Sequence, residues 1–242
     1  MSFTSDIVAY LSGARYRVGA TSLGGLDNPS GFVFNLPRQL DWHSTPHRHQ
    51  TLRNYDIVSG LIEPPADLSH EITLLSDEIS EGKLFVRNEK SHKTLCIAFH
   101  PGAGKAPNRW PAWQFAEVAN TLAREFRAMV LVTSGPMDDQ PTAEMEAALD
   151  VGFKVLKNQY IRTVASILKS ADLVISNDTG IMHVAGAVGT PVLSLFGPTD
   201  PEQWAPIGAQ NRYIQGANGD IRAIETGDVL RYAREMLRKE QR

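Results

Sequence analysis

Residues 174–187, "VISNDTGIMHVAGA", place an Asp-Thr-Gly triplet between an apolar run and a stretch of small residues. The triplet is compatible with two different folds. It carries the catalytic carboxylate of aspartic proteases, and it can equally mark the end of a strand that opens into an anion-binding helix. The fold of the surrounding chain therefore decides between the two interpretations.

From about residue 94, short apolar or β-branched runs alternate with helical segments. We predict strands at residues 94–99, 128–133, 153–156, 172–176 and 191–196. After Pro111, apolar residues recur at spacings of three and four, which predicts a helix. This alternation is typical of βαβ units, in which helices cover a parallel sheet. Because aspartic proteases are all-β and need two carboxylates, the pattern favours a strand that opens into a helix.

The first 90 residues are less regular. We predict a helix at residues 4–13, a loop at 19–48, a helix near 50–61 and a polar, turn-rich stretch beyond it. This arrangement indicates a partial N-terminal domain at 1–90, followed by a Rossmann-like α/β domain at 91–215. A C-terminal helix is expected within 216–242, with Thr226 as its N-cap.

The composition is globular, with 42% apolar and 21% charged residues. A net charge of −3 gives no reason to expect a nucleic-acid partner. The single cysteine, Cys96, stands in the apolar run "TLCIAF" and is expected to be a small buried hydrophobe. The N-terminus lacks the pattern of a signal peptide, and no apolar run approaches the ~20 residues that span a bilayer. We therefore expect a cytoplasmic protein.

The loop "HPGAGKAPNRWP" (100–111) joins a predicted strand to a predicted helix. Gly102 and Gly104 permit tight turns that expose N–H groups, and Lys105 and Arg109 add positive charge. With the helix N-terminus, these features predict a cradle for a pyrophosphate. The pattern is neither Walker A nor G-x-G-x-x-G, so an ordinary strand-to-helix turn with solvated cations remains the alternative.

A helix that starts at about Thr179 would place Thr179, Gly180 and His183 on one face. Asp178 can cap this helix or accept hydrogen bonds from a ligand's hydroxyl or amino groups. The alternative is a capping aspartate with a histidine packed on the helix. Because open α/β sheets bind ligands at the carboxyl ends of their strands, the position of both segments favours a ligand site.

The order of "HPGAGKAPNRWPAWQFAEVANTL", "LVTSGPMDD" and "ADLVISNDTGIMHVAGAVGTPVLSLFGPTDPEQWAPIG" resembles glycosyltransferase family 9, the ADP-heptose:lipopolysaccharide heptosyltransferases. The resemblance covers residues 94–208 strongly and extends weakly to 5–20. It implies a two-domain GT-B fold whose C-terminal Rossmann-like domain binds a nucleotide sugar. It also implies donor contacts from Ala103 and Gly104 to the diphosphate, from Asp138 or Asp139 to the ribose, and from Asp178, Thr179, Gly180 and His183.

The function implied by this resemblance is transfer of a sugar from an ADP-linked donor, ADP-heptose, to an acceptor like the lipopolysaccharide core. No cofactor is implied beyond the donor itself, and the acceptor partner would be a glycolipid or saccharide. A position peripheral to the inner membrane is the alternative to a purely cytoplasmic location. Three histidines, His43, His47 and His49, have a spacing that a metal site allows, but no cysteine or carboxylate cluster accompanies them. We assign no metal and expect solvated side chains or contacts to an anionic acceptor.

The sequence departs from the family pattern in two places. Asn108 stands where many relatives have a lysine near the phosphates, so Lys105 or Arg109 would have to replace that charge. The family's opening βαβ unit, with a Gly-Asp pair whose aspartate is the expected general base, has no counterpart, so the catalytic residue is unassigned. The alternative function is a catalytically incomplete nucleotide-sugar-binding module. Self-association through the incomplete domain is also expected.

Overall fold

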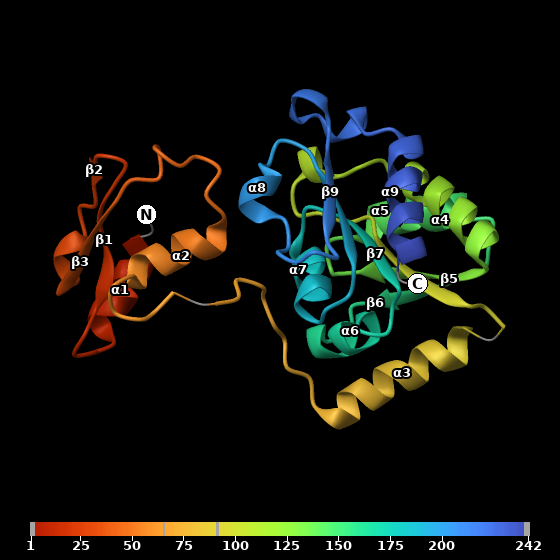
Figure 1. Ribbon diagram of the computed structural model, residues 1–242, viewed down its shortest axis with the longest axis horizontal. Coiled ribbons are helices and arrows are strands. Elements are labelled where there is room, and N and C mark those ends of the chain that lie inside the picture. The colour runs from red at the N-terminus through yellow and green to blue at the C-terminus, as the bar shows by residue number, and fades with distance from the viewer. Residues whose placement is uncertain (1–2, 65, 91, 240–242) are drawn as a thin grey trace. The chain divides into compact units, whose positions relative to one another are not determined.

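A computed structural model describes residues 3–64, 66–90 and 92–239 of the chain (Figure 1). Contacts divide the chain into two compact units. One comprises Met1–Leu68 with Glu202–Trp204, and the other comprises Ser69–Pro201 with Ala205–Arg242.

The larger unit is built on a six-stranded sheet in which every neighbouring pair is parallel. The strand order is β6-β5-β4-β7-β8-β9. Counted from β4, this is the 3-2-1-4-5-6 order of the Rossmann fold, and the order reverses between β4 and β7. The five predicted strands are confirmed to within one residue at each end, whereas β9 was missed. The strands are β4 (Leu95–His100), β5 (Ala128–Ser134), β6 (Phe153–Lys157), β7 (Leu173–Asn177), β8 (Val192–Phe196) and β9 (Arg212–Gln215).

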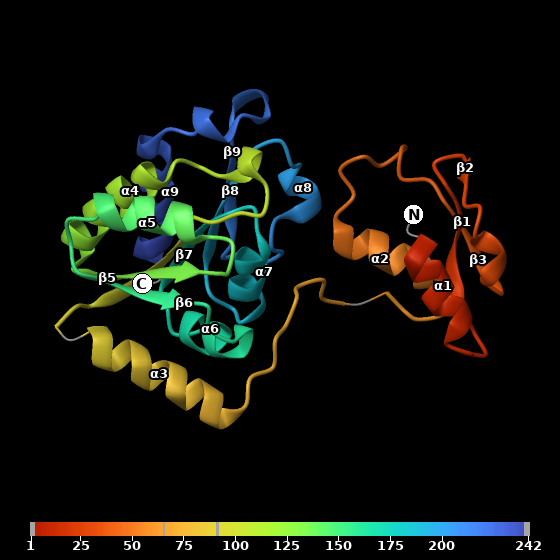
Figure 2. The ribbon, with the colours of Figure 1, turned by 180° about the vertical axis from the view of Figure 1, so that it is seen from behind.

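Helices cover both faces of this sheet (Figures 1 and 2). Side chains alternate along β4, so that Ile97 and Phe99 pack into one apolar cluster and Cys96 and Ala98 into the other. The first cluster lies under α4 (Ala112–Phe126), α5 (Asp139–Ala148) and α9 (Thr226–Lys239), and the second under α3 (Ser76–Lys90), α6 (Ile161–Leu168) and α7 (Gly180–Ala187). The predicted C-terminal helix is α9, and Cys96 is fully buried as expected. Within the part of the chain that the structure describes, no helix is both long and apolar enough to cross a membrane.

Helix α3 replaces the turn-rich stretch that the sequence predicted, so that prediction was wrong for residues 76–90. Only Gly82 and Val86 are buried in this helix, which explains why its apolar periodicity is weak. A Cβ at Gly82 would lie 2.2 Å from the carbonyl oxygen of Ser166, so glycine allows α3 to approach α6 closely. The division by contacts accordingly falls at Leu68/Ser69, whereas the sequence analysis placed a domain boundary after residue 90.

The smaller unit contains a three-stranded sheet of order β2-β1-β3, in which β1 is antiparallel to β2 and parallel to β3. Its two predicted helices are confirmed, but the predicted loop at 19–48 was wrong because it contains these strands. They are short, carry few apolar residues and include Pro37, so they lack a strand pattern in the sequence. The elements are α1 (Phe3–Leu11), β1 (Val18–Leu23), β2 (Leu26–Asp27), β3 (Leu36–Leu40) and α2 (Gln50–Val58). The short helix α8 (Pro201–Trp204) lies later in the chain.

Candidate functional site

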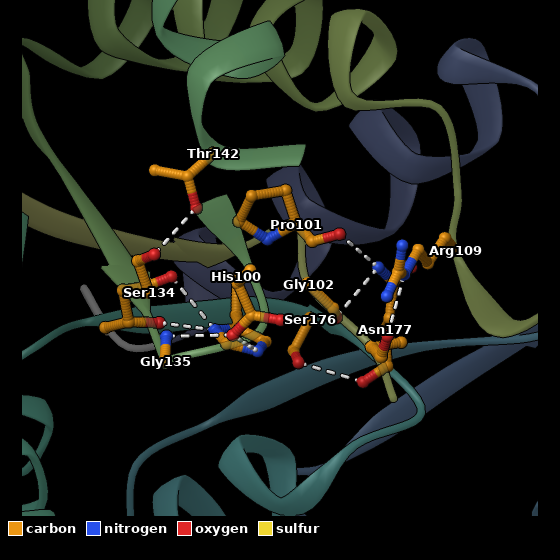
Figure 3. Close-up of polar contacts among 12 residues, drawn as sticks. His100, Pro101, Gly102, Arg109, Ser134, Gly135, Thr142, Ser176 and Asn177 are labelled. Carbon is orange, nitrogen blue, oxygen red and sulfur yellow. Dashed lines mark hydrogen bonds and ion pairs between the residues drawn. The ribbon is translucent and has the colours of Figure 1, made fainter. Parts of the chain in front are cut away.

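The loop after β4 is held at the point where the strand order reverses (Figure 3). Asn177, the last residue of β7, is fully buried. Its Nδ2 donates hydrogen bonds to the carbonyl oxygens of Pro101 (2.8 Å) and Gly102 (3.2 Å), and its Oδ1 accepts one from the backbone N–H of Trp110 (3.0 Å). Asn177 therefore joins the two strand ends that flank the reversal through both the nitrogen and the oxygen of its side-chain amide.

Two polar side chains of this loop also hold it in place. Arg109 Nε donates to the carbonyl oxygen of Ala103 at 2.7 Å. Asn108 Nδ2 donates to Asp178 Oδ2 at 2.9 Å and lies 3.3 Å from Thr199 Oγ1, which joins the loop to the segments after β7 and β8. Asn108 is thus an uncharged side chain that links loops, at the position where many relatives have a lysine.

Asp138, directly before α5, packs against the same loop. Its Oδ2 accepts a hydrogen bond from the backbone N–H of Gly135 at 2.8 Å and lies 3.6 Å from His100 Nε2. A Cβ at Gly102 would lie 2.1 Å from Asp138 Oδ1, so only glycine permits this approach. The structure therefore gives Gly102 a packing role beside Asp138.

The hydrogen bonds of His100 assign its tautomer. Nδ1 lies 3.0 Å from the carbonyl oxygen of Thr133 and 2.9 Å from its Oγ1, while that hydroxyl donates to the carbonyl oxygen of Phe99 at 3.3 Å. Because both Thr133 oxygens can only accept here, Nδ1 carries the proton. Burial lowers the pKa of His100, and the charge of Asp138 acts in the opposite direction. The neutral ring therefore presents Nε2 as an acceptor.

These groups line a pocket of about 360 Å³ at the carboxyl ends of β4, β5, β6 and β7. Its volume is in the range of small-molecule sites, roughly 300–1,000 Å³. One part is apolar, and another carries hydrogen-bonding groups. The lining residues are His100, Thr133, Ser134, Gly135, Pro136, Asp138, Leu156, Asn158, Gln159, Ile161, Val164, Thr179, Gly180, Ile181 and Val184.

Helix α7 begins at this pocket, as the Asp-Thr-Gly triplet predicted. Thr179 is its N-cap residue and Gly180 its first helical residue. The Thr179 side chain makes no capping hydrogen bond, so it does not occupy the N–H groups of the first turn. Those N–H groups and the helix dipole favour an anion at the pocket edge. Ile181 and Val184 of the same helix extend the apolar wall.

The structure brings together some of the predicted donor-binding residues. Asp138, Thr179 and Gly180 line the pocket. Asp139 does not line it, because its Oδ1 pairs with Lys157 Nζ at 2.9 Å on the surface. The remaining predicted residues are not among those that line the pocket, and their role in binding stays a prediction: Gly102, Ala103, Gly104, Lys105, Asn108, Arg109, Asp178 and His183.

The sequence analysis missed His100, Thr133 and Ser134. All three lie at the carboxyl ends of strands that the sequence predicted, which was the available signal. In the apolar wall, Leu156 also ends a predicted strand, whereas Ile161 and Val164 lie at the start of α6 and had no such signal. Among the described residues, no group of three or more histidine, cysteine, aspartate or glutamate side chains could hold a metal ion.

A parallel sheet in Rossmann order, with a pocket at its reversal and a helix N-terminus at the pocket edge, defines a Rossmann-like α/β domain. The chain belongs to glycosyltransferase family 9 (heptosyltransferase), whose family model matches residues 2–231. This confirms the resemblance found in the sequence.

Individual relatives agree with this assignment. The chain is 29% identical over 244 residues to lipopolysaccharide heptosyltransferase 2 of Escherichia coli K12, covering 94% of this chain and 66% of that protein. The solved structure of E. coli ADP-heptose lipopolysaccharide heptosyltransferase II matches with a TM-score of 0.82 at 23% identity, over 100% of this chain and 75% of that one. The structure of E. coli heptosyltransferase WaaC with ADP matches with a TM-score of 0.64 at 18% identity, over 86% of this chain and 61% of that one. These likenesses show a heptosyltransferase fold of GT-B type. The chain spans 66% of the length of the E. coli K12 relative.

Proposed function

We propose that the pocket binds the nucleoside diphosphate of a sugar donor, ADP-heptose, and that the chain takes part in transfer of the sugar to an acceptor like the lipopolysaccharide core. The observation that carries this proposal is the pocket at the β4/β7 reversal, which joins polar groups and a helix N-terminus to an apolar wall. The family supports sugar transfer, and the WaaC structure with ADP supports the choice of base.

Each part of the donor has a place with matching chemistry. The diphosphate would lie at Thr179 and Gly180, where N–H groups and the helix dipole favour negative charge. The ribose would contact Asp138, and the base would pack against the wall that includes Leu156 and Val164. The exposed Lys105 can turn toward the phosphates, because no hydrogen bond of the described chain fixes its ammonium group.

In the proposed reaction, a general base removes the proton of an acceptor hydroxyl, whose oxygen attacks the anomeric carbon of the donor. The bond between that carbon and the diphosphate oxygen breaks, and the helix N-terminus stabilises the departing diphosphate. The proposed acceptor is a glycolipid or saccharide, reached in the cytoplasm or at the inner membrane. No general base is assigned. Self-association through the smaller unit remains a prediction.

Because no general base is assigned, a second function stays open. The chain would then bind a nucleotide sugar without transferring the sugar by itself. A transfer assay with ADP-heptose separates the two functions in a preparation that has been shown to bind ADP. Formation of a glycosylated acceptor supports the transferase, and its absence supports the binding module.

Calorimetric titration with ADP, UDP and GDP tests the donor site. Gly180→Val adds bulk at the pocket lining in a place where no atom lies within 4 Å of a new Cβ. Gly227→Val is the matched control, since Gly227 also stands in the first turn of a helix, in equally open space and away from the pocket. We expect Gly180→Val to weaken ADP binding at least about tenfold, or about 1.4 kcal/mol, and Gly227→Val to leave it unchanged. Equal affinities in both variants would contradict the proposed site.

A further inference from the structure

The loop at residues 101–110, between β4 and α4, is exposed only at its tip, residues 104–107. Among the described residues, no hydrogen-bond acceptor takes the backbone N–H of Gly104, Lys105 or Ala106. A backbone N–H is a strong donor, and consecutive free N–H groups on a loop can bind an anion. The tip therefore offers three such donors.

Asn177 holds both ends of this loop at once (Figure 3). Its Nδ2 donates to the carbonyl oxygens of Pro101 and Gly102 at the first end, and its Oδ1 accepts from the N–H of Trp110 at the second. The side chain is fully buried and comes from β7, which lies beside β4 in the sheet. A single side chain thus fixes the two ends relative to each other, and with them the shape of the tip.

The second end of the loop is anchored in the core. Trp110 is 1% exposed, and its Nε1 donates to the carbonyl oxygen of Ile224 at 3.0 Å. Its indole meets the ring of Phe115 edge to face, with 5.0 Å between the ring centroids. Because this end is fixed in the core, the bonds of Asn177 hold the first end to a fixed point.

The tip lies beside the start of α7. Asn108, the residue after the tip, donates to Asp178 Oδ2 at 2.9 Å, and Asp178 directly precedes the N-cap residue Thr179. The free N–H groups of the tip are therefore close to the helix N-terminus where the diphosphate is proposed to bind.

We propose that Asn177 is a positioning residue for the diphosphate of the donor, which holds the loop in its binding conformation before the donor arrives. A loop that is ordered in advance loses less conformational entropy on binding, and this raises the affinity. Asn177 is not among the residues that line the pocket, so its effect passes through the loop. The inference rests on the proposed function, because it assumes that the pocket binds a nucleoside diphosphate.

Calorimetric titration with ADP and with adenosine, which lacks both phosphates, separates positioning from a general loss of structure. Asn177→Ala removes all the hydrogen bonds of the side chain, and Asn177→Ser keeps a hydroxyl group that can replace one of them. We expect Asn177→Ala to weaken ADP binding at least about tenfold and adenosine binding less than about twofold, with Asn177→Ser intermediate. Equal losses for both ligands, or no loss for either, would overturn the inference and leave the proposed donor site intact.

Asn120→Ala is the matched control. Asn120 is another nearly buried asparagine whose amide bonds to the backbone in both directions. Its Nδ2 donates to the carbonyl oxygen of Ala148 at 3.1 Å, and its Oδ1 accepts from the N–H of Asp150 at 3.0 Å. These contacts lie before β6, at the amino ends of the strands and away from the pocket. Asn120→Ala should lose stability but keep the ratio of ADP affinity to adenosine affinity; the same change of ratio as in Asn177→Ala would overturn the inference.

Hydrogen exchange in the unmodified chain provides a test that needs no folded Asn177 variant. We expect the amide of Trp110 to exchange slowly with and without ADP, because Asn177 accepts its proton in the free chain. The amides of Gly104, Lys105 and Ala106 should become slow only when ADP is added. A Trp110 amide that is protected only in the presence of ADP would show that the donor orders the loop, which would overturn the inference. Failure of the folded chain to bind ADP would overturn the proposed function and the inference with it.

Discussion

Gly102→Ala places a methyl group where the loop after β4 touches Asp138. The new Cβ would lie 2.1 Å from Asp138 Oδ1 and 2.2 Å from its Cγ, far inside van der Waals contact. The backbone cannot retreat freely, since Asn177 Nδ2 holds the carbonyl oxygen of Gly102 at 3.2 Å. Gly102 does not have a positive φ, so the effect comes from this contact and not from backbone strain. The carboxylate must therefore turn away.

The magnitude follows from what this movement breaks. Asp138 would lose its hydrogen bond from the N–H of Gly135, now 2.8 Å long, and a bond to a charged acceptor contributes roughly 1.5–3 kcal/mol. Moving the side chain from its preferred rotamer costs roughly a further 0.5–1.5 kcal/mol. The gain from replacing glycine by alanine in the unfolded chain, roughly 0.4–1 kcal/mol, offsets part of this loss. We expect a net destabilisation of about 2 kcal/mol.

Differential scanning calorimetry measures the effect. A loss of about 2 kcal/mol lowers the melting temperature of a unit of this size by roughly 4–8 °C. Gly104→Ala is the matched control for stability, since Gly104 lies in the same loop, has no positive φ, and would have no atom within 4 Å of its Cβ. Its melting temperature should remain within about 2 °C. Equal melting temperatures for the two variants, or a structure of Gly102→Ala in which Asp138 has not moved, would refute the reasoning.

Three further predictions concern the larger unit. Cys96 should resist alkylation at about pH 8 until the protein unfolds. Burial, as the larger cause, and the charge of Asp172 raise the pKa of its thiol to about 12. Rapid labelling of the folded chain would contradict its burial. Asn177→Asp should lower the free energy of unfolding by about 3–5 kcal/mol, because the new carboxylate would face two carbonyl oxygens. Calorimetry measures this loss, and an unchanged melting temperature would contradict the proposed link between the strand ends. The Arg162 guanidinium lowers the pKa of Glu78, so the stability from this pair is present above the unfolded pKa of about 4.3 and is lost as the pH falls through the lower folded pKa. Arg162→Met should flatten the dependence of melting temperature on pH in this range, and an unaltered dependence would show that the pair contributes nothing.

The parts of the fold that could be predicted are those with a strong local pattern. Five strands of the larger sheet contain apolar runs, and the helix after Pro111 has a clear apolar periodicity, so these were found. The short β9, with sequence RYIQ, has no such run and was missed. Helix α3 and strands β1 to β3 were missed because few of their residues are buried and their polar sequences match a loop equally well. Their structure depends on contacts with other elements, such as the approach of Gly82 to α6.

The residues of the site, like the elements of the fold, could be predicted from the sequence only in part. Adjacent carboxylates at Asp138 and Asp139 were equivalent in the sequence, but neighbouring residues point in different directions, and only Asp138 lies in the pocket. The sequence did not indicate that Arg109 Nε is bonded to the loop itself, and the attraction of Arg109 for phosphate stays a prediction. The only sequence signal for His100 was its position at the end of a predicted strand, and its acceptor atom is defined by Thr133 on the neighbouring strand.

The sequence by itself determined the family, the Rossmann-like order of strands and helices, and the helix that opens after the Asp-Thr-Gly triplet. Those features depend on periodicity and turn residues that lie close together along the chain. The tertiary structure alone decided which side chains meet at the β4/β7 reversal, because Asn177, Asp138 and His100 come from separate segments. Their separation, burial and tautomer are properties of contacts between distant parts of the chain, and local sequence does not encode them.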